Sequence, residues 1–257
     1  MKKYAKRYCV SSSILIIMTS LFTNVGWAEE KKIETSTQTF ELLLGATRVI
    51  YNLDSNGATL SVENKQDYPV LIRSKVFLED KEKLAPFAIS PPLFRLEGQQ
   101  KNRLRIVHTG EKNVEDRETL YWLCVTGIPP KEDDAWAENM NKKEINKQSA
   151  LVNVKVSISN CIKLMVRPSG LKRDTSDIAS SLLWKKEGNN LTVNNPTPFY
   201  INFSSLKVDG VEIKDAEHVS PFMTKRFSLP KDSPSIVQWQ VINDFGGKSK
   251  KYQSNLR

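Results

Sequence analysis

The sequence predicts an all-β protein made of two immunoglobulin-like β-sandwich domains. Short alternating or apolar runs recur along the chain, with turn residues between them at fairly even spacing. No run keeps a helical period. The series of short strands stops near Arg167-Pro168 and then starts again, which indicates a second domain. The two parts hold roughly 140 and 90 residues, and both are acceptable domain sizes.

Residues 1–28 have the pattern of a secretory signal peptide. Four Lys and Arg precede an apolar run from Ile14 to Phe22, and small residues follow up to Ala28. The apolar run is shorter than the ~20 residues of a membrane span. We therefore predict cleavage after Ala28 and an exported, soluble mature chain.

The charge of the chain is only mildly basic once this segment is removed. The 257 residues hold 38 Lys and Arg against 29 Asp and Glu, a net charge of +9. Without the four basic residues of the signal segment, 34 basic residues face the same 29 acidic ones, a net charge of +5. No run of basic residues with interleaved aromatics occurs, so the sequence gives no support for nucleic-acid binding.

The first domain, residues 29–167, begins with a strand, and the sequence does not show which face of the sheet the side chains after it occupy. Phe40, Leu42 and Leu44 alternate ahead of Gly45, and a glycine at this point indicates a bend or bulge. Parity cannot be counted across such a bend, so the sequence does not place Arg48 on either face. Further strands are expected at Val49–Tyr51, Ala58–Val62, Val70–Leu78 and Tyr121–Val125.

The domain ends in a run that predicts one long strand from Leu151 to Pro168. Its even positions are apolar: Val152, Val154, Val156 and Ile158, then Ile162, Leu164 and Val166. This period of two, rich in β-branched residues, is typical of a strand. The run exceeds the usual ~5–6 residues of a strand. We expect its first half to be an edge whose apolar row is offered to another chain.

Two cysteines remain after Cys9 leaves with the signal peptide. In an exported chain, Cys124 and Cys161 indicate one disulfide, with two buried free thiols as the alternative. Between them, residues 129–150 contain a charged stretch with few apolar residues apart from Trp136, Met140 and Ile145. We interpret it as a long mobile loop, with a short surface helix as the alternative. The bridge would fasten the base of this loop.

The second domain, residues 168–257, repeats the pattern of short strands and turns. Strands are expected at Leu182–Trp184, Leu191–Val193, Tyr200–Phe203, Leu206–Val208, Arg226–Leu229 and Ile236–Ile242.

The sequence offers no catalytic constellation. His108 and His218 are far apart, in different predicted domains, and neither has a metal-ligand partner at a useful spacing. Each is expected to be an ordinary exposed or half-buried side chain. No nucleophile motif or phosphate-binding loop occurs. We predict a protein that is not an enzyme and that needs no cofactor and no metal. Cations on strands remain, Arg48 and Lys163, and such residues are usually solvated.

Seven segments resemble the periplasmic pilus chaperones of the chaperone–usher pathway, in the family's order. They are Arg48–Tyr51, Pro91–Leu96, Asp116–Leu120, Ile128–Pro130, Ile162–Pro168, Asn195–Tyr200 and Ile242–Gly247. The cysteine pair, the long loop and the long N-terminal segment resemble the long-loop subfamily with a disulfide. One such segment would mean little, but seven in order are specific.

The resemblance implies two immunoglobulin-like domains set as an L with a cleft between them. Arg48 and Lys163 match the cleft cations that anchor the C-terminal carboxylate of a pilus or fibre subunit, and an Arg fork with a Lys charge suits a carboxylate. The subunit lacks its last strand, and the chaperone fills the gap before passing the subunit to an outer-membrane usher.

Further site residues follow from the same resemblance. The donor strand would present Val152, Val154, Val156 and Ile158. Phe40, Leu42 and Leu44 would extend that apolar surface. Glu118, Arg167 and Asp244 match charged residues that link the two domains. The donor row contains no Phe, which suits shallow acceptor pockets.

The implied protein lies in the periplasm and has no small-molecule substrate and no nucleic-acid partner. Because an exposed apolar edge tends to associate, we also expect the free chaperone to bind itself. The main alternative is a secreted two-domain adhesin or carbohydrate-binding protein, for which Trp136 is the one candidate contact. A secreted hydrolase would need a catalytic set that the sequence does not offer.

Overall fold

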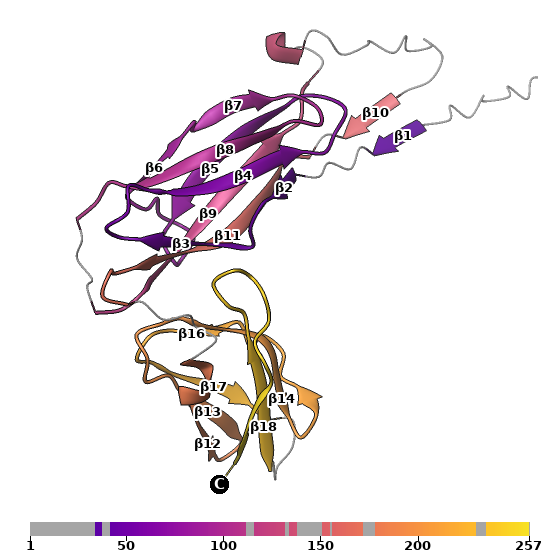
Figure 1. Ribbon diagram of the computed structural model, residues 1–257. Helices are drawn as coiled ribbons and strands as arrows, with labels where there is room; N and C mark the ends of the chain where they lie inside the picture. Colours follow the sequence, from indigo (N-terminus) through magenta and orange to yellow (C-terminus); the bar gives the residue numbers. More distant parts are fainter. Residues whose placement is uncertain are drawn as a thin grey trace, which may run out of the picture. The chain divides into compact units, whose positions relative to one another are not determined.

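The computed structural model describes residues 34–37, 42–111, 116–131, 134–137, 151–154, 156–171, 178–229 and 235–256. Almost all regular structure within these ranges is β-strand, and the strands build two sandwiches (Figure 1). The predicted all-β fold with two immunoglobulin-like sandwiches is confirmed. No helix within the described ranges is long and apolar enough to cross a membrane. The signal segment and Phe40 lie outside the described residues.

The N-terminal sandwich pairs a four-stranded sheet with a five-stranded one. The first sheet has the order β2 (Leu42–Leu44), β4 (Ala58–Asn64), β8 (Lys101–His108), β6 (Phe87–Ser90). The second has the order β3 (Arg48–Asn52), β11 (Ile158–Arg167), β9 (Thr119–Ile128), β5 (Val70–Phe77), β7 (Leu93–Leu96). Alternate residues of these strands form one buried core that includes Val62, Ile72, Leu104, Leu123 and Leu164.

The bend expected at Gly45 is confirmed, and it moves the chain from one sheet to the other. β2 pairs with β4, whereas β3 pairs with β11. The Gly45 amide donates to the Ser61 carbonyl at 2.9 Å, and a Cβ at this position would collide with the Ser61 hydroxyl. Glycine is therefore the residue that fits, and the crossing places Arg48 at the start of an edge strand of the five-stranded sheet.

The single long strand predicted from Leu151 to Pro168 is wrong, because the run forms two strands. β10 (Leu151–Val154) pairs with β1 (Glu34–Thr37) in a separate two-stranded sheet, and β11 starts only at Ile158. The physical reason lies in the neighbouring strand. Ile158 is opposite Gly127 near the end of β9, and Pro129 and Pro130 follow, which have no N–H for a ladder.

The C-terminal sandwich pairs a three-stranded sheet with a second sheet built around β14. The three-stranded sheet has the order β12 (Leu183–Glu187), β13 (Asn190–Asn194), β17 (Thr224–Ser228). The other has the order β15 (Val211–Glu212), β14 (Ile201–Val208), β18 (Ile236–Val241), β19 (Tyr252–Asn255), with β16 (His218–Val219) also paired to β14. Leu191, Ile201, Leu206 and Trp239 lie in its core.

Several details of this sandwich differ from the sequence prediction, and the short strands β15 and β16 are among those that were not expected. The runs Tyr200–Phe203 and Leu206–Val208 are one strand, β14, with a shift in its pairing to β18 between Phe203 and Ser205. β19 was not predicted, because Tyr252–Asn255 is mainly polar; its burial pattern alternates between half-buried and exposed. Its antiparallel pairing with β18, and not an apolar pattern in its sequence, makes this segment a strand.

The predicted disulfide is confirmed. Cys124 of β9 and Cys161 of β11 are bonded, and they are direct register partners with Cα atoms 4.0 Å apart. The bond therefore ties together the two strands that flank the long loop. Within that loop the described residues include one short 3-10 helix, η1 (Ala135–Ala137), which contains Trp136. Residues 129–131 and 134 of the predicted mobile segment are also described, and its residues 132–133 and 138–150 lie outside the described residues.

Candidate functional site

Arg48 and Lys163 lie directly opposite each other on neighbouring strands. β3 and β11 run parallel, and their pairing begins at this residue pair. Arg48 is only 8% exposed, and its Nε and Nη1 atoms have no hydrogen-bond partner among the described residues. Burial lowers the pKa of Arg48, while the charge of Asp244 opposes that shift. Buried donors without a partner are costly, so this guanidinium is suited to receive an anion.

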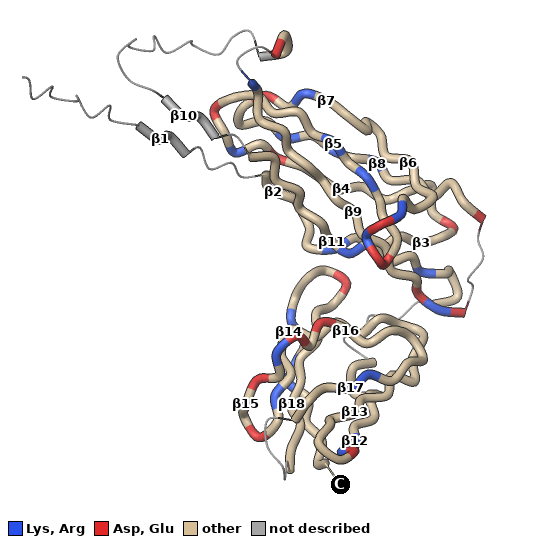
Figure 2. Tube along the Cα trace, turned by 180° about the vertical axis from the view of Figure 1, so that it is seen from behind, with Lys and Arg blue, Asp and Glu red and all other residues tan. Residues whose placement is uncertain are grey.

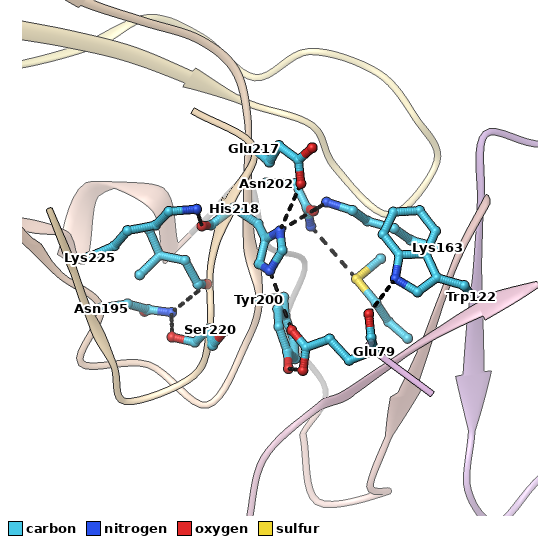
Figure 3. Close-up of polar contacts among 12 residues, drawn as sticks. Glu79, Trp122, Lys163, Asn195, Tyr200, Asn202, Glu217, His218, Ser220 and Lys225 are labelled. Atoms are coloured by element: carbon cyan, nitrogen blue, oxygen red, sulfur yellow. Dashed lines mark hydrogen bonds and ion pairs between the residues drawn. The ribbon is translucent and has the colours of Figure 1, made fainter. Parts of the chain in front are cut away.

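Lys163 is half-buried, and residues of both sandwiches surround it (Figure 3). Its Nζ donates to Asn202 Oδ1 at 2.6 Å and lies 3.4 Å from His218 Nδ1. Burial and then nearby cations, Arg48 first among them, lower the pKa of Lys163 to about 8, while Glu217 acts to raise it. A bound carboxylate would relieve that repulsion, so the two cations, here called the anion socket, are suited to bind an anion.

His218 takes part in this cluster, which the sequence did not predict. It is half-buried, as expected, but its Nε2 lies 3.5 Å from Glu79 Oε1 and its Nδ1 lies close to Lys163. Burial, then the charges of Lys163 and Lys225, lower the pKa of His218 to about 4, and Glu217 acts against them. The contact joins residues 55 positions apart, and nothing in the local sequence indicates it.

Glu118, Arg167 and Asp244 meet, as the resemblance implies. Arg167 Nε donates to Glu118 Oε1 at 2.7 Å, and its Nη1 and Nη2 donate to the two Asp244 oxygens at 2.6 and 2.9 Å. The second Glu118 oxygen accepts from the Tyr200 amide at 2.8 Å. Every charge in this group has a fixed partner, so the group joins the end of β11 to the C-terminal sandwich.

Opposing effects act on the pKa values of this buried group. Burial raises the pKa of Glu118, and the Arg167 charge works against that rise. For Arg167, burial acts to lower the pKa, but hydrogen bonds and charges from Asp244 and Glu118 outweigh it and raise the pKa. Removal of the guanidinium would leave Glu118, only 2% exposed, as a buried carboxyl without its ion partner.

The first half of β11 has a neighbour on one side only. β9 pairs with β11 from Ile158 to Val166, whereas β3 pairs with it only from Lys163 to Arg167. Among the described residues, no strand pairs with the other edge of residues 158–162. Val156 and Ile158 are 56% and 40% exposed. An open edge with exposed apolar side chains is able to accept another strand.

The other residues assigned to strand donation divide into three groups. Val152 and Val154 lie in β10, and their side chains are outside the described residues, as is all of Phe40. Leu42 is 5% exposed and belongs to the sandwich's own core, and Leu44 packs against that core. The expectation that Leu42 and Leu44 extend an exposed apolar row is therefore wrong. Their pairing with β4 turns them inward.

β2 nevertheless borders the open edge of β11 through a polar contact. The Asn160 side chain donates to the Leu42 carbonyl at 3.0 Å. β2 is also the outer strand of the four-stranded sheet, so an unpaired edge of each sheet of the sandwich lies at this point. No group of three His, Cys, Asp or Glu able to hold a metal occurs in the described part of the chain.

The open edge and Lys163 belong to one strand, β11, and Arg48 is opposite Lys163 on β3. A polypeptide that pairs with the edge of β11 would therefore be led to the two cations. This arrangement defines a class of protein that binds other polypeptides by strand addition, a chaperone-like class.

Comparison with known proteins places the chain in that class. Residues 41–172 match the family described as "Pili and flagellar-assembly chaperone, PapD N-terminal domain", and residues 177–253 match "Pili assembly chaperone PapD, C-terminal domain". The chain belongs to the PapD family of pilus-assembly chaperones of the chaperone–usher pathway. Members of this family are not enzymes, and the family is periplasmic.

Individual relatives agree with the family. The chain is 43% identical to the chaperone protein PsaB of Yersinia pestis over 99% of this chain and 97% of the relative. It is 52% identical to the chaperone protein AfaB of Escherichia coli over 77% and 79% of the two chains.

Two solved structures are similar over most of the chain. The E. coli chaperone DraB has a TM-score of 0.76 and 47% identity, covering 87% of this chain and all of that one. The SafB chaperone, solved in complex with the Salmonella enterica SafA pilin, has a TM-score of 0.77 and 43% identity, covering 86% and 99%.

Proposed function

We propose that this chain captures a newly exported pilus or fibre subunit, completes the subunit's sandwich with its own donor strand and passes it to an outer-membrane usher. The observation that carries the proposal is the open edge of β11, which leads to the Arg48–Lys163 pair. The relative SafB is solved with a pilin, which supports a subunit as the partner here.

The position of the socket sets the direction of the bound strand. A carboxylate at Arg48 and Lys163 ends the partner chain there, so the partner's preceding residues lie along β11 toward Val156. The partner therefore runs parallel to β11. From Val156 to Lys163 the path is roughly 23 Å at ~3.3 Å per residue, enough for a strand of about seven residues.

Donated side chains would supply the apolar part of the binding. Val152, Val154, Val156 and Ile158 are the proposed donor row, and Val156 and Ile158 are exposed in the free chain. Fully burying a Val or Ile stabilises a complex by about 1.5–3 kcal/mol, and this is an upper value for side chains already half-covered. The anchor would then fix the register of the row, because only one alignment places the carboxylate at the cations.

The test of the anchor is co-expression with the SafA pilin as probe subunit. Lys163→Met and Arg48→Met keep apolar stems and remove the charges. We expect the stoichiometric complex to be lost, while circular dichroism shows both variants folded. Arg73→Met and Lys75→Met, which remove exposed cations of β5, are the matched controls and should leave the complex intact. A complex that survives loss of both socket cations would overturn the anchor.

We also propose maturation by cleavage after Ala28, which yields a two-domain chain of residues 29–167 and 168–257. The basic start, apolar run and small residues before Ala28 support the cut. Mass spectrometry of the protein from a periplasmic extract tests it, because cleavage elsewhere gives a different mass. Transfer to the usher would be tested by release of the bound subunit on addition of the usher's periplasmic part.

A further inference from the structure

The Lys163 ammonium is held by a pair of residues from the other sandwich. Asn202 and His218 are direct register partners on β14 and β16, so their side chains are neighbours. Both reach Lys163, at 2.6 and 3.4 Å, and Figure 3 shows the lysine directed at them. Lys163 of one cross-strand pair thus contacts both members of a second one, Asn202–His218.

Asn202 has a fixed orientation. It is 2% exposed, and its Nδ2 donates toward Met165 Sδ at 3.7 Å, which leaves Oδ1 to accept from Lys163. Met165 is 1% exposed and packs with Leu120 and Tyr200. The residue two positions beyond Lys163 on the same strand thus contacts the amide nitrogen and favours the orientation with the amide oxygen toward the ammonium.

The tautomer of His218 follows from its nearest neighbours, because Glu217 Oε2 lies 3.9 Å from Nδ1, beyond hydrogen-bond distance, while Lys163 Nζ lies 3.4 Å from it. An ammonium only donates, so the Nδ1 that faces Lys163 is the acceptor and the proton is on Nε2, directed at Glu79. Glu79 is itself held: the Tyr200 hydroxyl donates to its Oε2 at 3.3 Å, and the Trp122 indole donates to its backbone carbonyl at 3.2 Å. A chain of contacts thus runs from Glu79 through His218 to Lys163 (Figure 3).

We propose that Asn202 and His218 are positioning residues for the carboxylate anchor, which hold the Lys163 ammonium in place and direct its remaining hydrogen toward a bound carboxylate. This inference rests on the proposed function. It gives the C-terminal sandwich a role in capturing the subunit, although Asn202 and His218 themselves would not contact the subunit strand. A lysine side chain is long and flexible, and fixing it before binding removes an ordering cost from the encounter.

The two residues are suited to this role because they accept a hydrogen bond without carrying negative charge. The charged groups around Lys163 are Glu217, Arg48, Lys225 and Lys81, and around His218 they are Glu79, Glu217, Lys163 and Lys225. Burial and the cations lower the pKa of Lys163 to about 8. Neutral acceptors favour the charged lysine, whereas a carboxylate in their place would compete with the ligand.

The first experiment needs no ligand. NMR of carbon-13-labelled lysine Cε atoms in the full chain follows the titration of Lys163, with its signal assigned by Lys163→Met. Asn202→Leu removes the acceptor and should lower the midpoint by about half to one pH unit. Asn202→Asp should raise it by about one unit, because a charged acceptor stabilises the ammonium more strongly.

These opposite shifts separate positioning from a merely structural role. A structural defect would lower the melting temperature of both variants. It would not shift the titration midpoint of Lys163 down in one variant and up in the other. Lys163 midpoints that stay unchanged, or that move the same way in both variants, would overturn the inference.

The second experiment measures binding with a synthetic peptide of the C-terminal strand of the SafA pilin, as free acid and as C-terminal amide. His218→Asn keeps a polar atom near the Nδ1 position, and His218→Gln keeps one near Nε2. Asn202→Leu and His218→Gln should weaken the acid peptide about tenfold, and His218→Asn less than about twofold. Binding of the amide should not change. Equal losses for the two His218 variants would remove His218 from the proposal.

The two experiments fail separately. If neither peptide binds the unaltered chain, the proposed function loses support, while the ligand-free titration still decides whether Asn202 positions Lys163.

Discussion

The two halves of β11 have the same alternating sequence but different surroundings. From Lys163 to Val166 the strand lies between β9 and β3, and Leu164 to Arg167 are all buried. From Ile158 to Ile162 it has β9 on one side only, and Ile158, Ser159 and Cys161 are exposed. A second neighbouring strand makes the difference. The covered half serves the fold and holds the cations, and the uncovered half is left for a partner.

The faces of the covered half also differ from each other. Its even residues, Leu164 and Val166, enter the core of the N-terminal sandwich. Its odd residues, Lys163, Met165 and Arg167, all contact the C-terminal sandwich. Both basic and acidic residues occur along both sandwiches (Figure 2). Because its side chains alternate between two faces, β11 supplies core residues on one face. On the other face it supplies the Lys163 cation and the Arg167 link to the C-terminal sandwich.

The largest expected effect comes from breaking the ionic link at the covered end. Arg167→Met should destabilise the protein by about 3–5 kcal/mol, because Glu118 is left as a buried carboxyl without its ion partner. Urea unfolding followed by tryptophan fluorescence measures the change. The matched control is Arg117→Met, which removes an exposed ion pair with Asp116 and a contact with the Phe222 ring, and it should cost much less stability. Similar losses of unfolding free energy in the two variants would show that the buried ion pair stabilises the protein no more than the exposed one.

How far the sequence predicts this arrangement depends on the kind of contact. Alternation predicted which residues of β11 enter the core, and composition with export predicted the Cys124–Cys161 bond. The break before Ile158 was not predicted, because it depends on where the partner strand β9 ends. The face of Arg48 was not predictable across the Gly45 bend. These features are set by neighbours distant in sequence.

The residues of the candidate site likewise divide into those that were predicted and those that were missed. The resemblance placed Arg48, Lys163, Glu118, Arg167 and Asp244, and the structure brings them into two groups. Asn202 and His218 were missed, because the register of β14 with β16 and the approach of the second sandwich to Lys163 leave no local signal. Leu42 was assigned to the exposed apolar surface from the resemblance, whereas its pairing with β4 places it in the core.

A smaller effect on stability is expected in acid. It comes from His218, which lies next to Lys163, the first residue of the covered half. His218 packs against Lys163, and its folded pKa of about 4 lies below the ordinary value of 6.5. The unfolded chain therefore binds a proton between these values that the folded chain does not. Stability from this residue is complete above pH 6.5 and is lost as the pH falls toward 4, by roughly 2–3 kcal/mol.

The variant His218→Asn isolates this contribution. It should remove the difference in unfolding free energy between pH 6.5 and pH 4 that belongs to the histidine, while the acid response of the carboxylates stays. Urea unfolding of both proteins across that range measures it. Parallel curves for the variant and the unaltered chain would show that the buried environment of His218 does not penalise its protonation.

The smallest effect on stability, and the most informative for function, is expected on the uncovered half of β11 and at Val156 just before it. Val156→Asp with Ile158→Asp should change the unfolding free energy by less than about 0.5 kcal/mol, because these side chains are exposed in the free chain. The same change should abolish capture of the SafA pilin, since two carboxylates would enter apolar pockets without partners. It should also remove self-association of the free chaperone, which sedimentation measures. Val156→Thr keeps the branched shape and should bind nearly as well. If the aspartate variant instead unfolds, the row belongs to the chaperone's own fold, and the contrast between the two halves of β11 is lost together with strand donation.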